Sequence, residues 1–425
     1  MILTTFLVAL LGSMAIGIPI AFALLVSGGA LMWQLDMFDP QILAQNLVNG
    51  ANSFPLLAVP FFMLAGELMN VGGLSRRIVD FAMTLVGHIR GGLGYVTIMT
   101  AIVLAALSGS AVADAAAMTA LLLPMMVAAG HDRARSAGLI ASAGIIAPVI
   151  PPSIGFIIFG VAANVSISKL FIAGIFPGIL MGAALWFTWR LVVRREQVTV
   201  MPRRSGREML AAARAASWAI GMPLIIIVGL RFGVFTPTEA AVVAAVYALF
   251  VSTVIYREMT LRQLYQVFVS SAKISAIIML LVAAAIVSAW LITVAGLPDR
   301  IVDLLDPFLD NPTLLVVICM LIVVIVGTSM DLTPTIMILT PIFMPVVKAA
   351  GVDPVYFGVL FMINTSIGLI TPPVGVVLNT VAGVGRIGMD EVTRGAWPFL
   401  LSQLGVLALL IVFPDLVIVP LNWLH

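Results

Sequence analysis

The sequence is poor in the residues on which most enzymes and soluble proteins depend. Of its 425 residues only 9% are charged, and it contains three histidines and a single cysteine. One cysteine excludes an intrachain disulfide and a cysteine metal cluster. No catalytic nucleophile, metalloenzyme or Walker-type phosphate motif stands out, and a net charge of +2 gives no support to nucleic acid binding. We therefore expect neither an enzyme nor a bound cofactor.

Apolar residues take the place of the missing charge. They make up 62% of the chain, and the mean hydropathy is +1.19, whereas soluble domains carry about 25% charged residues. These values predict a polytopic protein embedded in a lipid membrane. The apolar start at Ile2 is interpreted as the first span, because no basic segment precedes it as in a signal peptide. Cys319 lies in an apolar run and is expected to face lipid or to pack inside.

About 20 apolar residues cross a bilayer, and this length defines the expected spans. They lie near residues 2–15, 17–33, 54–70, 136–160, 170–193, 215–232, 238–256, 272–293, 356–380 and 398–418. The first two could instead form one long helix kinked at 17–19. The orientation of the chain, described below, favours two spans.

Two further apolar stretches have the wrong length for a span. Residues 95–129 would form a helix of about 50 Å, which is too long for a hydrocarbon core of about 30 Å. The tripeptide Ser108-Gly109-Ser110 divides this stretch, and the segment 327–334 divides a similar stretch at 314–347. Both stretches are predicted to be re-entrant helical hairpins. Non-helical backbone at membrane depth is tolerated where it lines a cavity, so the tips are expected to line a site.

Two pieces of sequence occur twice. VGGLSRRIVD at 71–80 returns as VAGLPDRIVD at 294–303, with seven of ten residues identical. PMMVAAGHD at 124–132 returns as PVVKAAGVD at 345–353, with five of nine identical. The offsets are 223 residues (from 71 to 294) and 221 residues (from 124 to 345). An internal duplication in an apolar chain is typical of transporters whose binding site lies between the repeats.

Basic residues set the orientation of membrane proteins. With the arginine-rich loop 194–214 in the cytoplasm, both termini are predicted to be periplasmic, and the first hairpin opens inward and the second outward. The two copies are then inverted. All 21 Lys and Arg then lie inside except Lys169, Arg231, Arg300 and Lys348.

The predicted fold is therefore an all-α polytopic membrane protein with inverted repeats, two re-entrant hairpins and two broken helices. Repeat one spans about 1–165 and repeat two about 215–425, with a linking span and basic loop at 166–214. The amphipathic segments 74–90 and 297–309 are expected to lie in the membrane interface and to link a scaffold to a moving part. The alternative is that both are ordinary connecting helices.

The hairpin tips carry groups that could bind a hard cation such as sodium, which prefers oxygen ligands. The first tip offers the hydroxyls of Ser108 and Ser110 and a tight turn at Gly109. The second tip offers Thr328, Ser329 and Asp331. An acid deep in an apolar run is costly and is by default functional, so Asp331 is the foremost candidate. Its alternative role is to cap the second arm of the hairpin.

Asp114 follows the first tip by one helical turn. It is either a similar ligand or a residue that complements the charge of the helix N-terminus.

After each hairpin comes a helix interrupted by paired prolines. Proline removes an amide donor and bars the preceding residue from helical geometry, so each helix must open and expose carbonyls to cations and N-termini to anions. Ser153, Asn364 and Thr371 are, with the prolines of the breaks, candidate ligands for the substrate, and Asn364 and Thr365 are candidate ligands for sodium. The breaks and these neighbours are Pro151, Pro152, Ser153, Asn364, Thr365, Thr371, Pro372 and Pro373.

Four other polar residues are expected to have ordinary roles. Glu67 and Glu239 lie at the ends of spans and are predicted to be interfacial or helix-capping. His88 and His131 flank basic loops and are predicted to be surface histidines with satisfied hydrogen bonds rather than proton relays.

Several motifs together resemble one transporter family. They are NSFPLLAVPFFMLAGELMN, GGLSRRIVDFA, SGSAVADAAAMT, APVIPPSIG, FTPTEAA and GLITPPVG, which extend from Asn52 to Gly375. With these motifs the chain resembles the large membrane subunit of tripartite ATP-independent periplasmic (TRAP) transporters, over essentially its whole length. Within the family it looks most like the large permeases of diketogulonate systems.

The resemblance implies a sodium-driven importer of organic acids in the bacterial inner membrane, with a scaffold and a mobile elevator domain. It also implies two partners, a small four-span membrane subunit and a periplasmic substrate-binding protein. The sodium sites of the family lie around the hairpin tips and broken helices. Two alternatives stay open: a stand-alone sodium and carboxylate symporter that needs no partner, and a non-transporting assembly or signalling subunit.

Overall fold

The computed structural model of the chain describes residues 2–194, 196, 198–297, 300, 302 and 308–424. These residues contain α-helices, one short 3-10 helix and one short π-helix, and they contain no strand. The first part of the chain forms α1 (Ile2–Ala15), α2 (Ile20–Gln34), α3 (Pro40–Ala51), η1 (Phe54–Leu57), α4 (Ala58–Val71), α5 (Leu74–Val86), α6 (Gly92–Ser108), α7 (Ala111–Ala128), α8 (Arg133–Gly144), α9 (Ile154–Ala163) and α10 (Ile167–Val193). The second part forms α11 (Gly206–Arg231), α12 (Pro237–Phe250), η2 (Val251–Ile255), α13 (Leu261–Val294), α15 (Pro312–Gly327), α16 (Leu332–Ala349), α17 (Pro354–Gly368), α18 (Val376–Gly385), α19 (Met389–Val412) and α20 (Asp415–Leu424).

The helices agree with the predicted membrane fold. Among the described residues, 8 helical stretches are long and apolar enough to cross a membrane. α1 and α2 are separate helices that pack on each other, joined by a turn at Gly17 with φ of +86°. The first 33 residues therefore form a helical pair and not one kinked helix.

Three helices differ from the predicted spans. α3 was not expected, because only part of its surface is apolar; Asp39 caps it through the amide of Gln41, and Pro40 stands at its first position. α13 has 34 residues and begins at a capping box formed by Thr260 and Gln263, well before the predicted start at 272. At about 1.5 Å per residue it is about 51 Å long, so it cannot lie upright in the membrane over its full length. α20 is separated from α19 after Phe413.

Both hairpins and both broken helices are present as predicted. α6 and α7 turn at Gly109 and Ser110, and α15 and α16 turn at residues 328–331. α8 and α9 are separated by turns at 145–153, and α17 and α18 by turns at 369–375. The bonds Pro151–Pro152 and Pro372–Pro373 are both cis.

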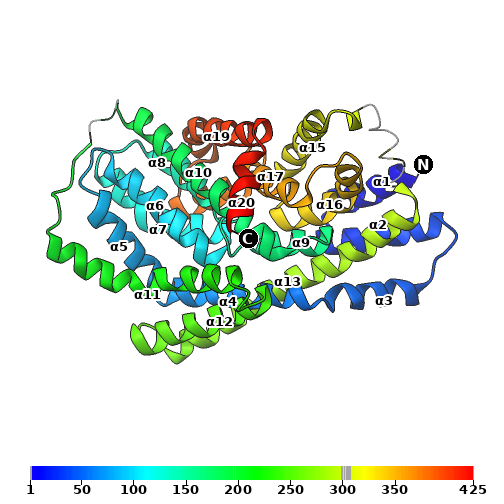
Figure 1. Cartoon of the computed structure of the whole chain (residues 1–425), viewed down its shortest axis with the longest axis horizontal. Helices are drawn as coiled ribbons and strands as arrows, with labels where there is room; N and C mark the ends of the chain where they lie inside the picture. Colours follow the sequence, from blue (N-terminus) through cyan, green and yellow to red (C-terminus); the bar gives the residue numbers. More distant parts are fainter. Residues whose placement is uncertain are drawn as a thin grey trace.

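Long helices lie along one side of the molecule and support the hairpins. In Figure 1, α3, α4, α11 and α13 run across the lower part of the view, and the hairpins and broken helices lie above them. α3 and α4 pack against α13, α2 packs against α13, and α12 packs against α4. We call α2, α3, α4, α11, α12 and α13 the basal helices.

The hairpins are held by the broken helices. α7, the second arm of the first hairpin, packs against α18, and α16, the second arm of the second hairpin, packs against α9. Each hairpin therefore contacts the second half of the other copy's broken helix. This reciprocity is what an inverted repeat around a central site predicts.

α8 and α19 cross at close backbone distance. A Cβ built on Gly138 would lie 2.2 Å from the carbonyl carbon of Gly395, and one built on Gly395 would lie 1.8 Å from the carbonyl oxygen of Ala134. Both glycines are buried. The crossing is a small-residue helix contact of the kind that membrane proteins favour.

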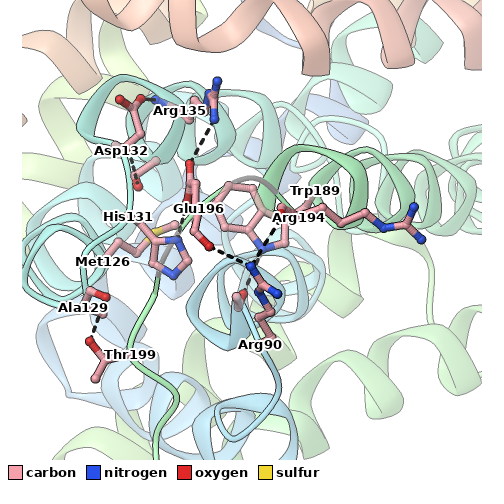
Figure 2. A network of polar contacts seen from close by, with 12 residues as sticks. Arg90, Met126, Ala129, His131, Asp132, Arg135, Trp189, Arg194, Glu196 and Thr199 are labelled. Atoms are coloured by element: carbon pink, nitrogen blue, oxygen red, sulfur yellow. Dashed lines mark hydrogen bonds and ion pairs between the residues drawn. The ribbon is translucent and has the colours of Figure 1, made fainter.

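The basic loop after α10 is fixed to the base of the first hairpin. Figure 2 shows His131, Arg135 and Arg90 converging on Glu196. Nδ1 of His131 lies 2.9 Å from one carboxylate oxygen of Glu196, and the Arg135 guanidinium lies 3.4 Å from the other. Arg90 donates to the Glu196 carbonyl at 2.9 Å. His131 is 6% exposed, so it is a buried histidine and not the predicted surface one.

The loop continues along the hairpin base beyond Glu196. The amide and the hydroxyl of Thr199 both donate to the carbonyl of Ala129 at 3.0 Å. Arg195, in the same loop, lies outside the described residues.

Most of the predicted amphipathic segment 297–309, including Asp299 and Asp303, also lies outside the described residues. Its counterpart at 74–90 contains α5, which packs between α6 and α11.

We predict that Glu196→Gln destabilises the protein by about 1–3 kcal/mol, because it weakens a buried, charge-assisted network. Burial alone would raise the pKa of Glu196, but hydrogen bonds and charge from His131 and Arg135 outweigh it and hold the pKa below its ordinary value of 4.5. A carboxylate whose pKa is lower in the folded protein than in the unfolded protein stabilises the fold at pH values above its unfolded-state pKa. This stabilisation is lost as the pH falls through the folded-state pKa. The stability difference from wild type should therefore be full at neutral pH and shrink below about pH 4.5.

Thermal unfolding of the purified protein across this pH range measures the effect. Glu208→Gln is the matched control, because Glu208 forms an exposed pair with Arg204 at 3.2 Å. Such pairs contribute about 0–1 kcal/mol, and glutamine also suits its capping position. Equal melting temperatures for wild type and Glu196→Gln at pH 7 would contradict the prediction.

Candidate functional site

The first hairpin tip is a tight polar turn. Gly109 ends α6 with φ of +61°, a left-handed conformation that glycine adopts without strain. Ser110 caps α7 by accepting the amide of Ala113 at 3.4 Å. Ser108 donates its hydroxyl to Asp114 at 2.5 Å and accepts the amide of Ser110 at 3.1 Å.

Asp114 belongs to the first tip. It is 4% exposed, one carboxylate oxygen accepts the Ser108 hydroxyl, and the other has no hydrogen-bond partner among the described residues. From the sequence, Asp114 is either a ligand or a residue that complements the charge of the helix N-terminus. A buried, half-satisfied carboxylate favours a ligand, because an unpartnered buried charge is unfavourable.

The first tip touches the first helix break. A Cβ built on Gly109 would lie 2.6 Å from the carbonyl oxygen of Pro152, so the tip approaches the exposed carbonyls of the break as closely as glycine allows. Ser153 closes this break. Its hydroxyl donates to the carbonyl of Pro148 at 2.5 Å and accepts the amide of Phe156 at 3.2 Å, which caps α9.

The second tip repeats this arrangement with different residues. The carbonyl of Thr328 accepts the amide of Val374 at 3.3 Å, which ties the tip to the second break. The hydroxyl of Thr328 donates to Ile325 and lies 3.5 Å from that of Ser329. Gly327 and Gly368 pack backbone to backbone, since a Cβ on Gly368 would lie 2.7 Å from the carbonyl carbon of Gly327.

Asp331 is the N-cap of α16. Its carboxylate accepts the amide of Leu332 at 2.8 Å, and its carbonyl accepts the hydroxyl of Thr335 at 2.9 Å. The residue is exposed, and no basic side chain among the described residues lies within ion-pair distance of it. Asp331 therefore caps α16 as the alternative interpretation predicted, and its second carboxylate oxygen stays available for a ligand.

The polar residues near the second break form hydrogen bonds within and between helices; Asn364 and Thr365 are buried, and Thr371 is half-buried. Asn364 donates its amide to the Met320 carbonyl at 2.5 Å, which holds α17 against α15. The hydroxyls of Thr365 and Thr371 donate to carbonyls one turn earlier, at Phe361 and Ile367, both at 2.8 Å. The hydroxyl of the neighbouring Ser366 is buried without a partner among the described residues. A hydroxyl that donates to a carbonyl keeps lone pairs with which it can still bind a cation.

The two halves of the site meet at the start of α9. A Cβ built on Gly155 would lie 2.2 Å from the side chain of Met362 and 2.9 Å from that of Leu332. The first break therefore lies against the start of α16 and the middle of α17. The N-termini of α7, α9, α16 and α18 all begin at tips or breaks, and their positive dipole ends favour an anion.

The available ligands are oxygen atoms. No group of three or more His, Cys, Asp or Glu that could hold a metal ion occurs among the described residues. Serine hydroxyls, an unpartnered carboxylate oxygen and the carbonyls freed at the breaks fit a monovalent hard cation such as sodium better than a transition metal.

Two acids lie closer to the first tip than their positions in the sequence indicated. Asp114 is the buried one of the two tip acids, and its signal was the spacing of six residues from Ser108, which the turn at Gly109 converts into a contact. Glu67 lies beside this tip and not merely at a helix end. Glu239 caps α12 in a capping box with Thr236, as predicted, and Cys319 is buried, which leaves packing as its role.

Comparison with known proteins identifies the family of the chain. The family described as "Tripartite ATP-independent periplasmic transporter, DctM component" matches residues 7–416. The chain is 57% identical to the 2,3-diketo-L-gulonate TRAP transporter large permease protein YiaN of Escherichia coli, over 99% of each chain. It is 38% identical to the sialic acid TRAP transporter large permease protein SiaM of Vibrio cholerae, over 95% of each.

A solved structure shares the fold. The YdaH transporter of Alcanivorax borkumensis superposes with a TM-score of 0.62 over 88% of this chain and 87% of that one, at 16% identity. Matches over nearly the full length, at this level of identity to named large permeases, confirm the resemblance read from the motifs. The chain therefore belongs to the DctM family, the large permease component of TRAP transporters, whose members are permeases and not enzymes.

Proposed function

We propose that the protein imports a small organic acid across the bacterial inner membrane and couples this import to the sodium gradient. The observation that carries the proposal is the pair of hairpin tips, each in contact with its own broken helix. Such sites supply carbonyls and hydroxyls for a cation and helix N-termini for an anionic group. The similarity to a diketogulonate permease supports a keto sugar acid as the substrate.

The sodium ligands that we propose are the tip residues and the carbonyls beside the breaks. Asp114 joins the residues predicted from the sequence, because it is buried and half satisfied. The complete set is Ser108, Gly109, Ser110, Asp114, Thr328, Ser329, Asp331, Asn364 and Thr365. The substrate carboxylate would meet the N-termini of α9 and α18, beside Pro151–Ser153 and Thr371–Pro373.

Movement of the hairpins past the basal helices would expose the site to each side in turn. The reciprocal packing of α7 on α18 and of α16 on α9 supports a single moving body. In this scheme both termini are periplasmic, and the repeats at about 1–165 and 215–425 are joined by the span and basic loop at 166–214. The fixing of that loop to the hairpin base through Glu196 supports its being an ordered connection.

Two partners complete the proposed system. The substrate would be delivered by a periplasmic binding protein, and a small four-span subunit would complete the membrane part. The family description, with its words tripartite and periplasmic, supports this assembly.

Reconstitution tests the proposal. The purified chain, with the small subunit and the binding protein, is placed in proteoliposomes with labelled diketogulonate outside. We expect uptake that requires an inward sodium gradient and the binding protein, and that ceases when potassium replaces sodium. Uptake without the binding protein would instead favour a stand-alone symporter. Flux that is absent, or independent of sodium, would overturn the coupling.

A further inference from the structure

A basic pocket lies at the end of α10, where the chain enters the arginine-rich loop. It measures about 370 Å3, and sites for small molecules measure roughly 300–1,000 Å3. Its walls come from the turn before α6, the first turn of α6 and the last turns of α10. The polar and aromatic residues that line it are Arg90, Tyr95, Trp186, Arg190 and Arg194. The pocket is therefore separate from the hairpin tips and the helix breaks.

The lining of the pocket carries three arginines and no carboxylate. Arg90, Arg190 and Arg194 are exposed, and none of them forms an ion pair within the described part of the chain. The helix dipole favours cations in the last turn of a helix, which accounts for Arg190 and Arg194 on α10. It does not account for Arg90, which comes from another element. Like charges repel each other, so the three guanidinium groups together favour an anion between them.

Arg90 is held in position by the backbone of the basic loop. Its guanidinium donates to the carbonyl of Glu196 at 2.9 Å and to that of Arg194 at 3.3 Å, as Figure 2 shows. Both bonds use the same terminal nitrogen, and a guanidinium carries further N–H donors in a planar fork. This fork matches the oxygens of a phosphate group in a bidentate geometry. The fixed position of Arg90 therefore suits a phosphate.

Aromatic side chains make part of the wall rigid. The ring centroids of Tyr95 and Trp186 lie 4.2 Å apart, and Tyr95 is buried. The neighbouring Trp189 donates its ring N–H to the carbonyl of Gly91 at 2.9 Å, which fastens α10 to the start of α6. A Cβ built on Gly94 would lie 2.0 Å from the Trp189 ring, so the two helices are in close contact. A wall that is already ordered reduces the entropy lost when a ligand binds.

The surroundings of the pocket indicate a lipid as the source of the phosphate. The pocket adjoins the basic loop, which is cytoplasmic in the predicted orientation, and Trp and Tyr are enriched where a membrane meets water. Ile89 lines the pocket, and Phe187 and Leu191 lie beside it in sequence on α10; they are 40%, 62% and 48% exposed. Apolar side chains next to a basic pocket suit the acyl chains of a lipid. Basic pockets between helices on the cytoplasmic side are typical sites for anionic headgroups.

We propose that this pocket binds the phosphate group of an anionic phospholipid of the cytoplasmic leaflet, with the acyl chains along α10. Phosphatidylglycerol fits the lining, because it carries a phosphate and no cation. Phosphatidylethanolamine fits less well, because its ammonium group would add a positive charge to a pocket that offers no carboxylate. The site goes beyond the proposed transport and does not depend on it, since no residue of the hairpin tips or helix breaks lines the pocket.

Native mass spectrometry of the full-length chain in a neutral detergent tests the site. Phosphatidylglycerol and phosphatidylethanolamine with identical acyl chains are titrated separately, and we expect the first to bind more tightly. Arg190→Gln and Arg194→Gln should each weaken phosphatidylglycerol binding roughly 10-fold, as expected for the loss of a charge-assisted hydrogen bond. Arg203→Gln is the matched control. It removes the same charge from an exposed position in the same loop, outside the pocket, and should bind the lipid as wild type does.

Equal binding of the two lipids by wild type overturns the proposal, and so does unchanged binding of phosphatidylglycerol by the Arg190→Gln and Arg194→Gln double variant. Inorganic phosphate that binds wild type as tightly as the lipid would make the occupant a soluble anion. Loss of lipid binding when the small membrane subunit is added would assign the pocket to a protein contact; both results also overturn the proposal. Melting temperatures measured without lipid show whether the variants fold. If one single variant does not fold, the other decides.

Discussion

Replacing Asp331 with asparagine is expected to abolish most sodium-dependent uptake while the second hairpin stays folded. Asparagine caps helices about as well as aspartate, so the bond from the Leu332 amide is retained. The negative charge that we propose binds the cation is lost, which should weaken the apparent affinity for sodium roughly 10- to 100-fold. Uptake in proteoliposomes over a range of sodium concentrations measures the change.

Asp331→Ala separates the two roles of the residue. Alanine removes both the cap and the charge, and loss of the cap costs about 1 kcal/mol of stability. If Asp331 binds the cation, both variants lose uptake and only the alanine variant loses stability. Undiminished uptake by Asp331→Asn, with loss confined to Asp331→Ala, would show that the residue acts only as a helix cap.

Substitution of Gly395 by alanine should give the largest loss of stability. Its Cβ would lie 1.8 Å from the carbonyl oxygen of Ala134 and 2.2 Å from the carbonyl carbon, and backbone atoms of a helix cannot rotate aside. Overpacking costs typically 1–3 kcal/mol and occasionally more, and a backbone collision falls at the upper end. We expect a lower melting temperature in detergent, or no monodisperse protein on size-exclusion chromatography.

Gly405→Ala is the control in the same helix. No described atom lies within 4 Å of a Cβ at this position, and alanine gains up to about 1 kcal/mol in helix propensity over glycine. The control should therefore be as stable as wild type or more stable. A Gly395→Ala protein that melts at the wild-type temperature would show that α8 and α19 can move apart at no cost.

The hairpins and broken helices could be predicted because their signals are strong. A stretch as long as 95–129 exceeds the bilayer, and Pro151-Pro152 cannot continue a helix. α3 could not be predicted from apolar length, because it lies against α13 and needs only a partial apolar face. Its start was readable in Asp39-Pro40, a cap followed by a first-turn proline.

Site residues were harder to predict than helices. The sequence ranked Asp331 first because it stands out in an apolar run, yet Asp331 is exposed and Asp114 is buried. Burial depends on which elements surround a residue, and α4 approaches the first tip from a distant part of the chain. His131 was misjudged for the same reason, since its partner Glu196 lies 65 residues away.

The packing of each hairpin on the broken helix of the other repeat bears on how a leak across the membrane could form. α7 is held by α18 and α16 by α9, so neither tip can withdraw while the other stays in place without breaking a helix interface. A passage open to both sides at once would require that separation. In the proposed transport scheme, leakage of sodium would therefore require one of these two helix interfaces to break.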